Sequence, residues 1–107
     1  MKFLDRFYDS ILDGSKVLTR RPVKGPNEDP LVGIYRRETV TFHPSLRELN
    51  VRYTGISQGV LADVDDDEAH LEGFPDARAF CDFWDSIYHD GAHLDRVVWR
   101  IRFEVVL

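Results

Sequence analysis

The sequence is poor in the residues that build disulfides, metal centres or membrane spans. It holds one cysteine, Cys81, so no disulfide can form within the chain. No pair of cysteine or histidine residues has the spacing of zinc ligands, and we expect neither a metal nor another cofactor. No stretch reaches the ~20 apolar residues that cross a bilayer, and charges interrupt residues 1–14 too often for a signal peptide. We therefore expect a soluble, cytoplasmic protein that does not enter a membrane.

Acidic residues outnumber basic ones, but the two charges are unevenly spread. The formal net charge is −5, with 19 Asp and Glu against 14 Lys and Arg. Sequence-independent binding of long nucleic acid is therefore disfavoured, because its affinity comes mainly from neutralising many phosphates. The stretch 16–37 is nevertheless rich in Lys and Arg, whereas 63–72 is acidic. The basic stretch remains suited to a small anionic or nucleoside ligand.

The rest of the composition is typical of one globular domain. With 107 residues, 43% of them hydrophobic, we expect a single domain over 1–107 and favour a monomer. Periodicity and residue type predict helices at 3–13, 65–72 and 75–88, and strands at 16–21, 38–43, 49–56 and 97–105. The stretch 22–33 is rich in proline and glycine and is predicted to be a loop. This order favours an α+β fold, a small curled sheet or barrel flanked by helices, over a doubly wound sheet.

Several elements carry sharper signals. The strand at 97–105 alternates strictly and places on one face Val97, Trp99, Ile101, Phe103 and Val105. The helix at 75–88 has an aromatic stripe that we interpret as core rather than as a base-stacking platform: Phe80, Phe83 and Trp84. Glycines are expected to end the first two helices, at Gly14 and Gly73, and Asp65 with Glu68 resembles a capping box. Cys81 is interpreted as structural or semi-exposed rather than as a nucleophile, and no chemistry is assigned to His43, His70, His89 and His93.

Two motifs stand out along the chain. The first has the pattern Gly-x-Lys-x-x-Thr-x-Arg, at Gly14, Lys16, Thr19 and Arg21, and the second is the Glu-Gly-Phe at 72–74, before the aromatic helix. Together with the strand VVWRIRFEVV, these motifs resemble the ASCH domain, a small PUA-like β-barrel family linked to RNA and modified nucleosides. The resemblance covers most of the chain. It implies a PUA-like β-barrel flanked by helices, with RNA or a small nucleoside or nucleotide as the partner.

One branch of this family, the acetylcytidine amidohydrolases, uses a lysine, a threonine and a glutamate to remove an acetyl group from the exocyclic nitrogen of the nucleoside. Lys16, Thr19 and Glu72 match these positions and are the expected catalytic residues. The family commonly has a Gly-Asp pair before its second strand, whereas Gly33 has no Asp beside it. The substrate therefore stays open. Two alternatives to the amidohydrolase also stay open: a non-catalytic RNA-binding or regulatory module, and a ribonuclease-type ASCH protein.

The residue types fit acyl transfer. A threonine hydroxyl becomes a nucleophile when a base takes its proton, and a lysine can serve if its amine is neutral. The ordinary pKa of lysine is about 10.4, so burial or nearby positive charge must lower it. We expect Arg20 and Arg21 to bind an anionic group of the ligand and to lower the pKa of Lys16. Glu72 is expected either to relay a proton to the leaving amine or to hold Lys16 in place.

Strand geometry limits this site. Residues three apart on a regular strand face opposite sides about 10 Å apart. Lys16 and Thr19 therefore share a pocket only if Lys16 lies in the turn before the strand, or if a bulge redirects one of them. By the same alternation we expect at most one of Arg20 and Arg21 in the pocket, and favour Arg21. If these residues do not form a site, Lys16 is expected to be an ordinary solvated lysine, Thr19 an ordinary strand residue and Glu72 a surface residue.

Overall fold

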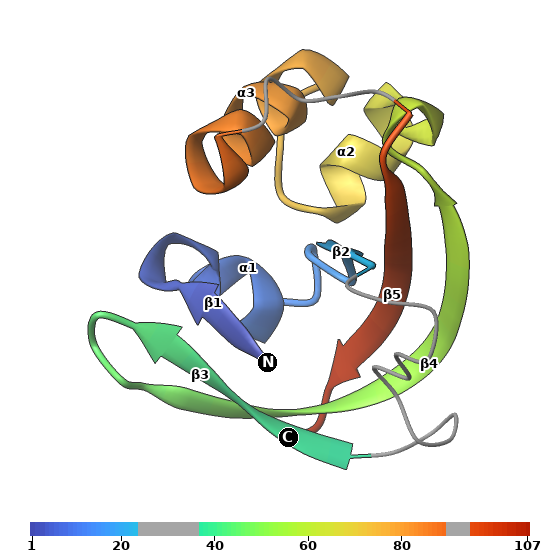
Figure 1. The fold of residues 1–107 in the computed structure, drawn as a ribbon. Coiled ribbons are helices and arrows are strands. Elements are labelled where there is room, and N and C mark those ends of the chain that lie inside the picture. Colours follow the sequence, from blue (N-terminus) through green and yellow to red (C-terminus); the bar gives the residue numbers. More distant parts are fainter. Residues whose placement is uncertain (24–36, 90–94) are drawn as a thin grey trace.

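The computed structural model describes residues 1–23, 37–89 and 95–107. These residues form one five-stranded sheet in the order β1-β3-β4-β5-β2. The strands are β1 (Lys2–Leu4), β2 (Leu18–Pro22), β3 (Arg37–His43), β4 (Glu48–Val60) and β5 (Val97–Val105). β1 pairs with β3 in parallel, and the other neighbours are antiparallel. The sheet curls into a half-barrel around the helices (Figure 1), which confirms the expected α+β class.

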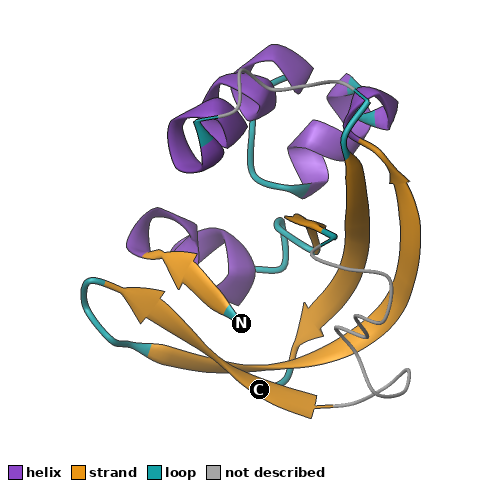
Figure 2. Cartoon of the chain, viewed as in Figure 1, coloured by secondary structure: helices purple, strands orange, loops and turns teal. Residues whose placement is uncertain are grey.

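The helices gather on the open side of the half-barrel (Figure 2). They are the 3₁₀ turns η1 (Asp5–Phe7) and η2 (Leu61–Asp63) and the α-helices α1 (Tyr8–Leu12), α2 (Asp66–Leu71) and α3 (Ala77–Tyr88). α2 and α3 confirm the helices predicted at 65–72 and 75–88. Of the predicted loop at 22–33, residues 24–33 lie outside the described residues, Gly33 among them. In the described part of the chain, no helix has both the length and the apolar character of a membrane span.

The first segment differs from the helix expected over 3–13. β1 and η1 come first, and α1 is one short helix behind them. Phe3, Phe7 and Ile11 are all buried, as the helical pattern required, but Phe3 reaches the core from a strand. The helix prediction was wrong there because the backbone of β1 pairs with one side of β3. Apolar spacing alone does not reveal such a long-range pairing.

β5 occupies the predicted residues, but its alternation is incomplete. Ile101 and Phe103 are buried as expected. At the start of the strand, Val98 is fully buried and Val97 is 47% exposed, which is the reverse of the prediction. Trp99 is partly buried against the core. Val98 lies on the opposite face of the strand from Ile101, because β5 pairs with β2 in unbroken register, so the buried face of β5 changes along its length.

Aromatic rings join the sheet to the helices in the core. The ring of Phe3 lies 5.9 Å from that of Phe42 and 5.8 Å from that of Phe103. Phe74, after α2, contacts Phe7 at 5.7 Å and Phe80 of α3 at 5.6 Å. Burial of each such side chain contributes about 1.5–3 kcal/mol. The core therefore ties α3 to the sheet through the segment that follows α2.

The end of α2 lies against the free edge of β2. The N–H of Val17 donates to the Leu71 carbonyl at 2.9 Å, and the N–H of Arg20 donates to Oε1 of Glu72 at 3.2 Å. Edge strands leave such groups unpaired unless another element covers them. α2 therefore covers this part of the β2 edge and places Glu72 there.

Both ends of α2 follow their sequence signals. Asp65 is the N-cap, and its carboxylate accepts from the Glu68 N–H at 2.8 Å. The reciprocal half of a capping box is absent from the described contacts, because the Glu68 carboxylate binds arginines instead. Gly73 follows the helix at φ +94°, as Gly14 follows α1 at +84°. Both glycines have the left-handed conformation predicted for a helix end.

Candidate functional site

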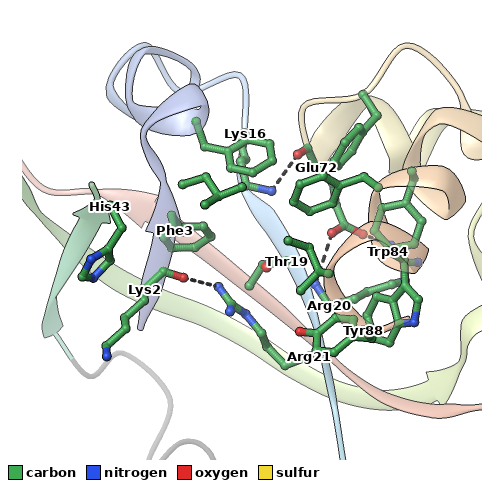
Figure 3. A pocket seen from close by; sticks show the side chains of 16 residues that line it. Lys2, Phe3, Lys16, Thr19, Arg20, Arg21, His43, Glu72, Trp84 and Tyr88 are labelled. Carbon is green, nitrogen blue, oxygen red and sulfur yellow. Dashed lines mark hydrogen bonds and ion pairs between the residues drawn. The ribbon is translucent and has the colours of Figure 1, made fainter. Parts of the chain in front are cut away.

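A cavity of about 210 Å³ is lined by both edge strands of the half-barrel, β1 and β2, and by α3 (Figure 3). Its wall includes all the residues expected at the site: Lys16, Thr19, Arg20, Arg21 and Glu72. The first four come from β2 and the turn before it, and the last comes from the end of α2. The fold thus brings together two motifs that lie about fifty residues apart in the sequence.

Lys16 is buried in the turn before β2, with 3% of its surface exposed. This position confirms the first of the two alternatives that strand geometry allowed, in which Lys16 lies in the turn and no bulge is needed. Nζ donates to the carbonyl oxygens of Leu18 at 3.1 Å and Glu72 at 2.6 Å, and lies 4.6 Å from the centre of the Phe7 ring. Burial lowers the pKa of Lys16 to about 7, and the charge of Arg21 adds to this effect. The negative charge of Glu72 acts in the opposite direction.

Thr19 lies on β2 opposite Ile101 of β5 and is 5% exposed. Figure 3 places it near the middle of the cavity. Its hydroxyl has no hydrogen-bond partner among the residues that the structure describes. The hydroxyl oxygen is not fully enclosed by protein atoms, although the residue as a whole is buried. The Thr19 hydroxyl is therefore available to a ligand.

Arg20 belongs to a chain of ion pairs, which we call the Arg20 network: Glu72, Arg20, Glu68 and Arg100. Nη1 of Arg20 pairs with Oε2 of Glu72, and Nη2 pairs with Oε2 of Glu68 at 2.6 Å. The other oxygen of Glu68 pairs with Arg100 of β5. The Arg20 side chain is 0% exposed. A buried charge of this kind is tolerated only when it is paired, and Arg20 has two carboxylate partners.

Glu72 contacts the two site cations through different groups. Its carboxylate binds Arg20, while its main-chain carbonyl accepts from Lys16. Burial raises the pKa of Glu72 above its ordinary value, and the charges of Lys16 and Arg20 oppose that rise. The contact with Lys16 uses the main chain of Glu72, so it does not decide between the two roles expected for the Glu72 side chain.

Arg21 has a different environment from its neighbour. Nη2 donates to the carbonyl oxygen of Lys2 in β1 at 2.9 Å, and the guanidinium lies 4.9 Å from the centre of the Phe3 ring. Burial lowers the pKa of Arg21 from its ordinary value, and Tyr88 opposes this. Among the described residues, Arg21 forms no ion pair with a carboxylate. The negative charge of Glu72 acts on Arg21 without forming an ion pair with it.

The expectation that at most one of the two arginines enters the pocket was wrong, because both line the cavity. It assumed that the pocket lies over one face of the strand. Instead, β2 is an edge strand, and Glu72 accepts from the main-chain N–H of Arg20 at that edge. A cavity beside an edge is accessible to side chains from both faces.

Sequence reasoning missed several wall residues. α3 contributes an aromatic wall that includes Phe80, Phe83, Trp84 and Tyr88, and β3 contributes His43. The stripe on α3 was assigned to the core, and Phe80 and Trp84 are indeed buried. Helical spacing identifies the inward face of a helix but not what that face meets. In the described part of the chain, no cluster of His, Cys, Asp or Glu side chains could hold a metal ion.

The sequence matches no protein-family model and no curated protein at a significant level. Solved structures are similar. One is the ASCH domain from Lactobacillus crispatus JV V101, with a TM-score of 0.68 and 19% identity over 91% of this chain and 68% of that one. This chain has the ASCH-domain fold.

Two further structures share this fold. A protein of Enterococcus faecalis V583 from the DUF984 family has a TM-score of 0.69 and 17% identity over 98% of this chain and 75% of that one. The hypothetical protein PH0355 has a TM-score of 0.65 and 15% identity over 99% of this chain and 100% of that one. The resemblance that the motifs indicated is thereby confirmed at the level of the ASCH fold.

Proposed function

We propose that the cavity binds a cytidine unit, free or in RNA, and hydrolyses an acyl-amide on its exocyclic nitrogen. The proposal draws on the ASCH-like motifs and on one central observation. Lys16 is buried beside the same cavity as the unpartnered Thr19 hydroxyl, and its pKa is lowered to about 7. A base whose pKa lies near the working pH combines a useful neutral fraction with useful proton affinity.

The contacts of Lys16 are compatible with a base. A neutral amine has two N–H donors and one lone pair, whereas an ammonium has three donors. The carbonyls of Leu18 and Glu72 take two donors, so the neutral form would satisfy both carbonyls and keep its lone pair free. Lys16 would thus be oriented by main-chain groups before it accepts a proton.

In the proposed reaction, Lys16 takes the proton of the Thr19 hydroxyl as its oxygen attacks the acyl carbonyl carbon. The carbon–nitrogen bond then breaks, and the amine of cytidine leaves with the proton held by Lys16. This leaves an acyl ester on Thr19. Water attacks the ester and gives one proton to Lys16, which returns it to the Thr19 oxygen as the carbon–oxygen bond breaks. The carboxylic acid that is released then ionises in solution.

The test is acetate release from cytidine acetylated on its exocyclic nitrogen. Thr19→Val and Lys16→Met should each lower kcat by at least about 10²-fold, because nucleophile and base act in the same step. Thr54→Val, a change of the same type at an exposed position of β4, should retain wild-type turnover. Acetate release by wild type at the background rate of the Thr19→Val variant would contradict the proposal.

A second candidate, a non-catalytic RNA-binding module, is favoured by the ring contact of Lys16. Two carbonyls and the face of Phe7 at 4.6 Å also suit a charged ammonium. In that case Lys16 stays charged and holds the turn beside the cavity. Short RNA would then bind without acetate release, and its affinity would fall with salt by a slope that corresponds to few phosphates.

A further inference from the structure

The wall of the cavity is positively charged although the chain is acidic. Its basic side chains are Lys2, Arg20 and Arg21, and also Lys16 when it is protonated, against the single carboxylate of Glu72, whereas the whole chain has a net charge of −5. A concave site with one sign of charge concentrates ligands of the opposite sign. The cavity therefore selects for negative charge in what it binds.

The one carboxylate in the wall does not neutralise the whole set. Glu72 is bound to Arg20, and Arg20 has a second carboxylate partner in Glu68. Arg21 has the Lys2 carbonyl at 2.9 Å and the ring of Phe3, and no carboxylate among the described residues. The Nε atoms of both arginines are buried without a hydrogen-bond partner there. Arg21 therefore differs from Arg20 in having no carboxylate bound to its guanidinium among the described residues.

A partly buried guanidinium without a counter-ion is costly, and an anionic ligand removes that cost. The planar fork of arginine matches the oxygen atoms of a phosphate, which accept charge-assisted hydrogen bonds. In Figure 3, Arg21 lies beside Lys2, and Thr19 is drawn between Arg21 and Lys16. A phosphate at Arg21 and an acyl group at Thr19 would thus occupy separate parts of one ligand.

We infer that the cavity takes its ligand as a nucleotide, with a phosphate bound by Arg21, rather than as an uncharged nucleoside. This inference rests on the proposed function and narrows it to a phosphorylated cytidine unit. The phosphate comes from a mononucleotide or from an RNA strand. Arg20, whose charge is already paired, does not share this role.

The test compares the dissociation constants of cytidine, cytidine 5′-monophosphate and a cytidine trinucleotide, measured by calorimetry at low salt. Wild type should bind at least one phosphorylated ligand tighter than cytidine by on the order of tenfold or more. A gain with the monophosphate identifies the mononucleotide, and a gain confined to the trinucleotide identifies the strand. The preference should shrink as salt is raised.

Two variants assign the preference to Arg21. Arg21→Gln should abolish the preference for phosphate, and Arg21→Lys should keep part of it, since it keeps the charge without the fork. Arg102→Gln, at an exposed position of β5 outside the cavity wall, makes the same change in net charge and should keep the full preference.

The failures can be told apart. If cytidine and its phosphorylated forms bind wild type equally well, or Arg21→Gln keeps the full preference, the inference is wrong and the proposed function stands. If none of the three ligands binds, the inference is wrong, and acetate release from acetylated cytidine decides the proposed function separately. If either variant does not fold, the measurements on wild type still test the inference. A site without an unpaired positive charge would show no preference for the phosphorylated ligands and no weakening of that preference by salt.

Discussion

The two sides of the cavity differ in how their charges are paired, although adjacent residues of the same type contribute to them. On one side, Arg20 is fully buried and bound to Glu72 and Glu68. On the other, Arg21 contacts a main-chain carbonyl and an aromatic ring, without a carboxylate in the described part of the chain. Residue type alone therefore does not separate a structural cation from a ligand-binding one. What separates them is whether a carboxylate is paired with the arginine.

The largest expected effect comes from the Arg20 network. Arg20→Met leaves the buried carboxylate of Glu72 unpaired and should lower the free energy of unfolding by about 3–5 kcal/mol. Arg21→Met removes a charge that has no such partner and should not lower the free energy of unfolding by more than about 1 kcal/mol. Urea unfolding of both variants measures the difference. Equal losses would mean that the two sides are not distinct, and adding Glu72→Gln to Arg20→Met should recover part of the loss.

The pH dependence of stability is expected to report the lowered pKa of the buried Lys16. The pKa of Lys16 is lowered from 10.5 to about 7 by folding, so between these values the unfolded chain binds the proton more tightly. The contribution of Lys16 to stability therefore rises with pH through this range, by up to about 1.4 kcal/mol per pH unit, and is flat below pH 7. The free energy of unfolding of wild type relative to Lys16→Met should rise accordingly between pH 7 and 10. A constant difference would show that Lys16 keeps its ordinary pKa.

The smallest expected effect concerns how α2 holds Glu72. Asp65→Ala removes the N-cap of α2 and should lower the free energy of unfolding by about 1 kcal/mol. Asp76→Ala removes the equivalent cap of α3, where the carboxylate accepts from the Ala79 N–H at 2.8 Å, and serves as its matched control. Both should cost similar stability in urea unfolding. Only Asp65→Ala should also slow acetate release, because α2 alone ends at Glu72; equal turnover in the two variants would argue against this positioning role.

The local parts of the site were predictable from sequence, and the long-range parts were not. Gly14 and Gly73 end helices as their positions indicated, and the turn position of Lys16 was one of two alternatives that strand geometry allowed. Three features depended on contacts between distant segments: the parallel pairing of β1 with β3, the presence of both Arg20 and Arg21 in the cavity wall, and the cavity that α3 lines. Edge pairing and the covering of an edge by another element leave no local pattern, so sequence spacing could not reveal them.

The central claim, that Lys16 acts as a base, is tested most directly by the rate of acetate release between pH 6 and 9. The rate should rise through about pH 7 as Lys16 loses its proton, following a single ionisation unless Glu72 must also hold a proton, which would give a bell. Lys16→Arg should be inactive although it preserves charge, since arginine does not release its proton in this range. We predict a higher rate at pH 8 than at pH 6 for wild type and none above background for Lys16→Arg. A fully active Lys16→Arg variant would show that this position supplies positive charge rather than a base.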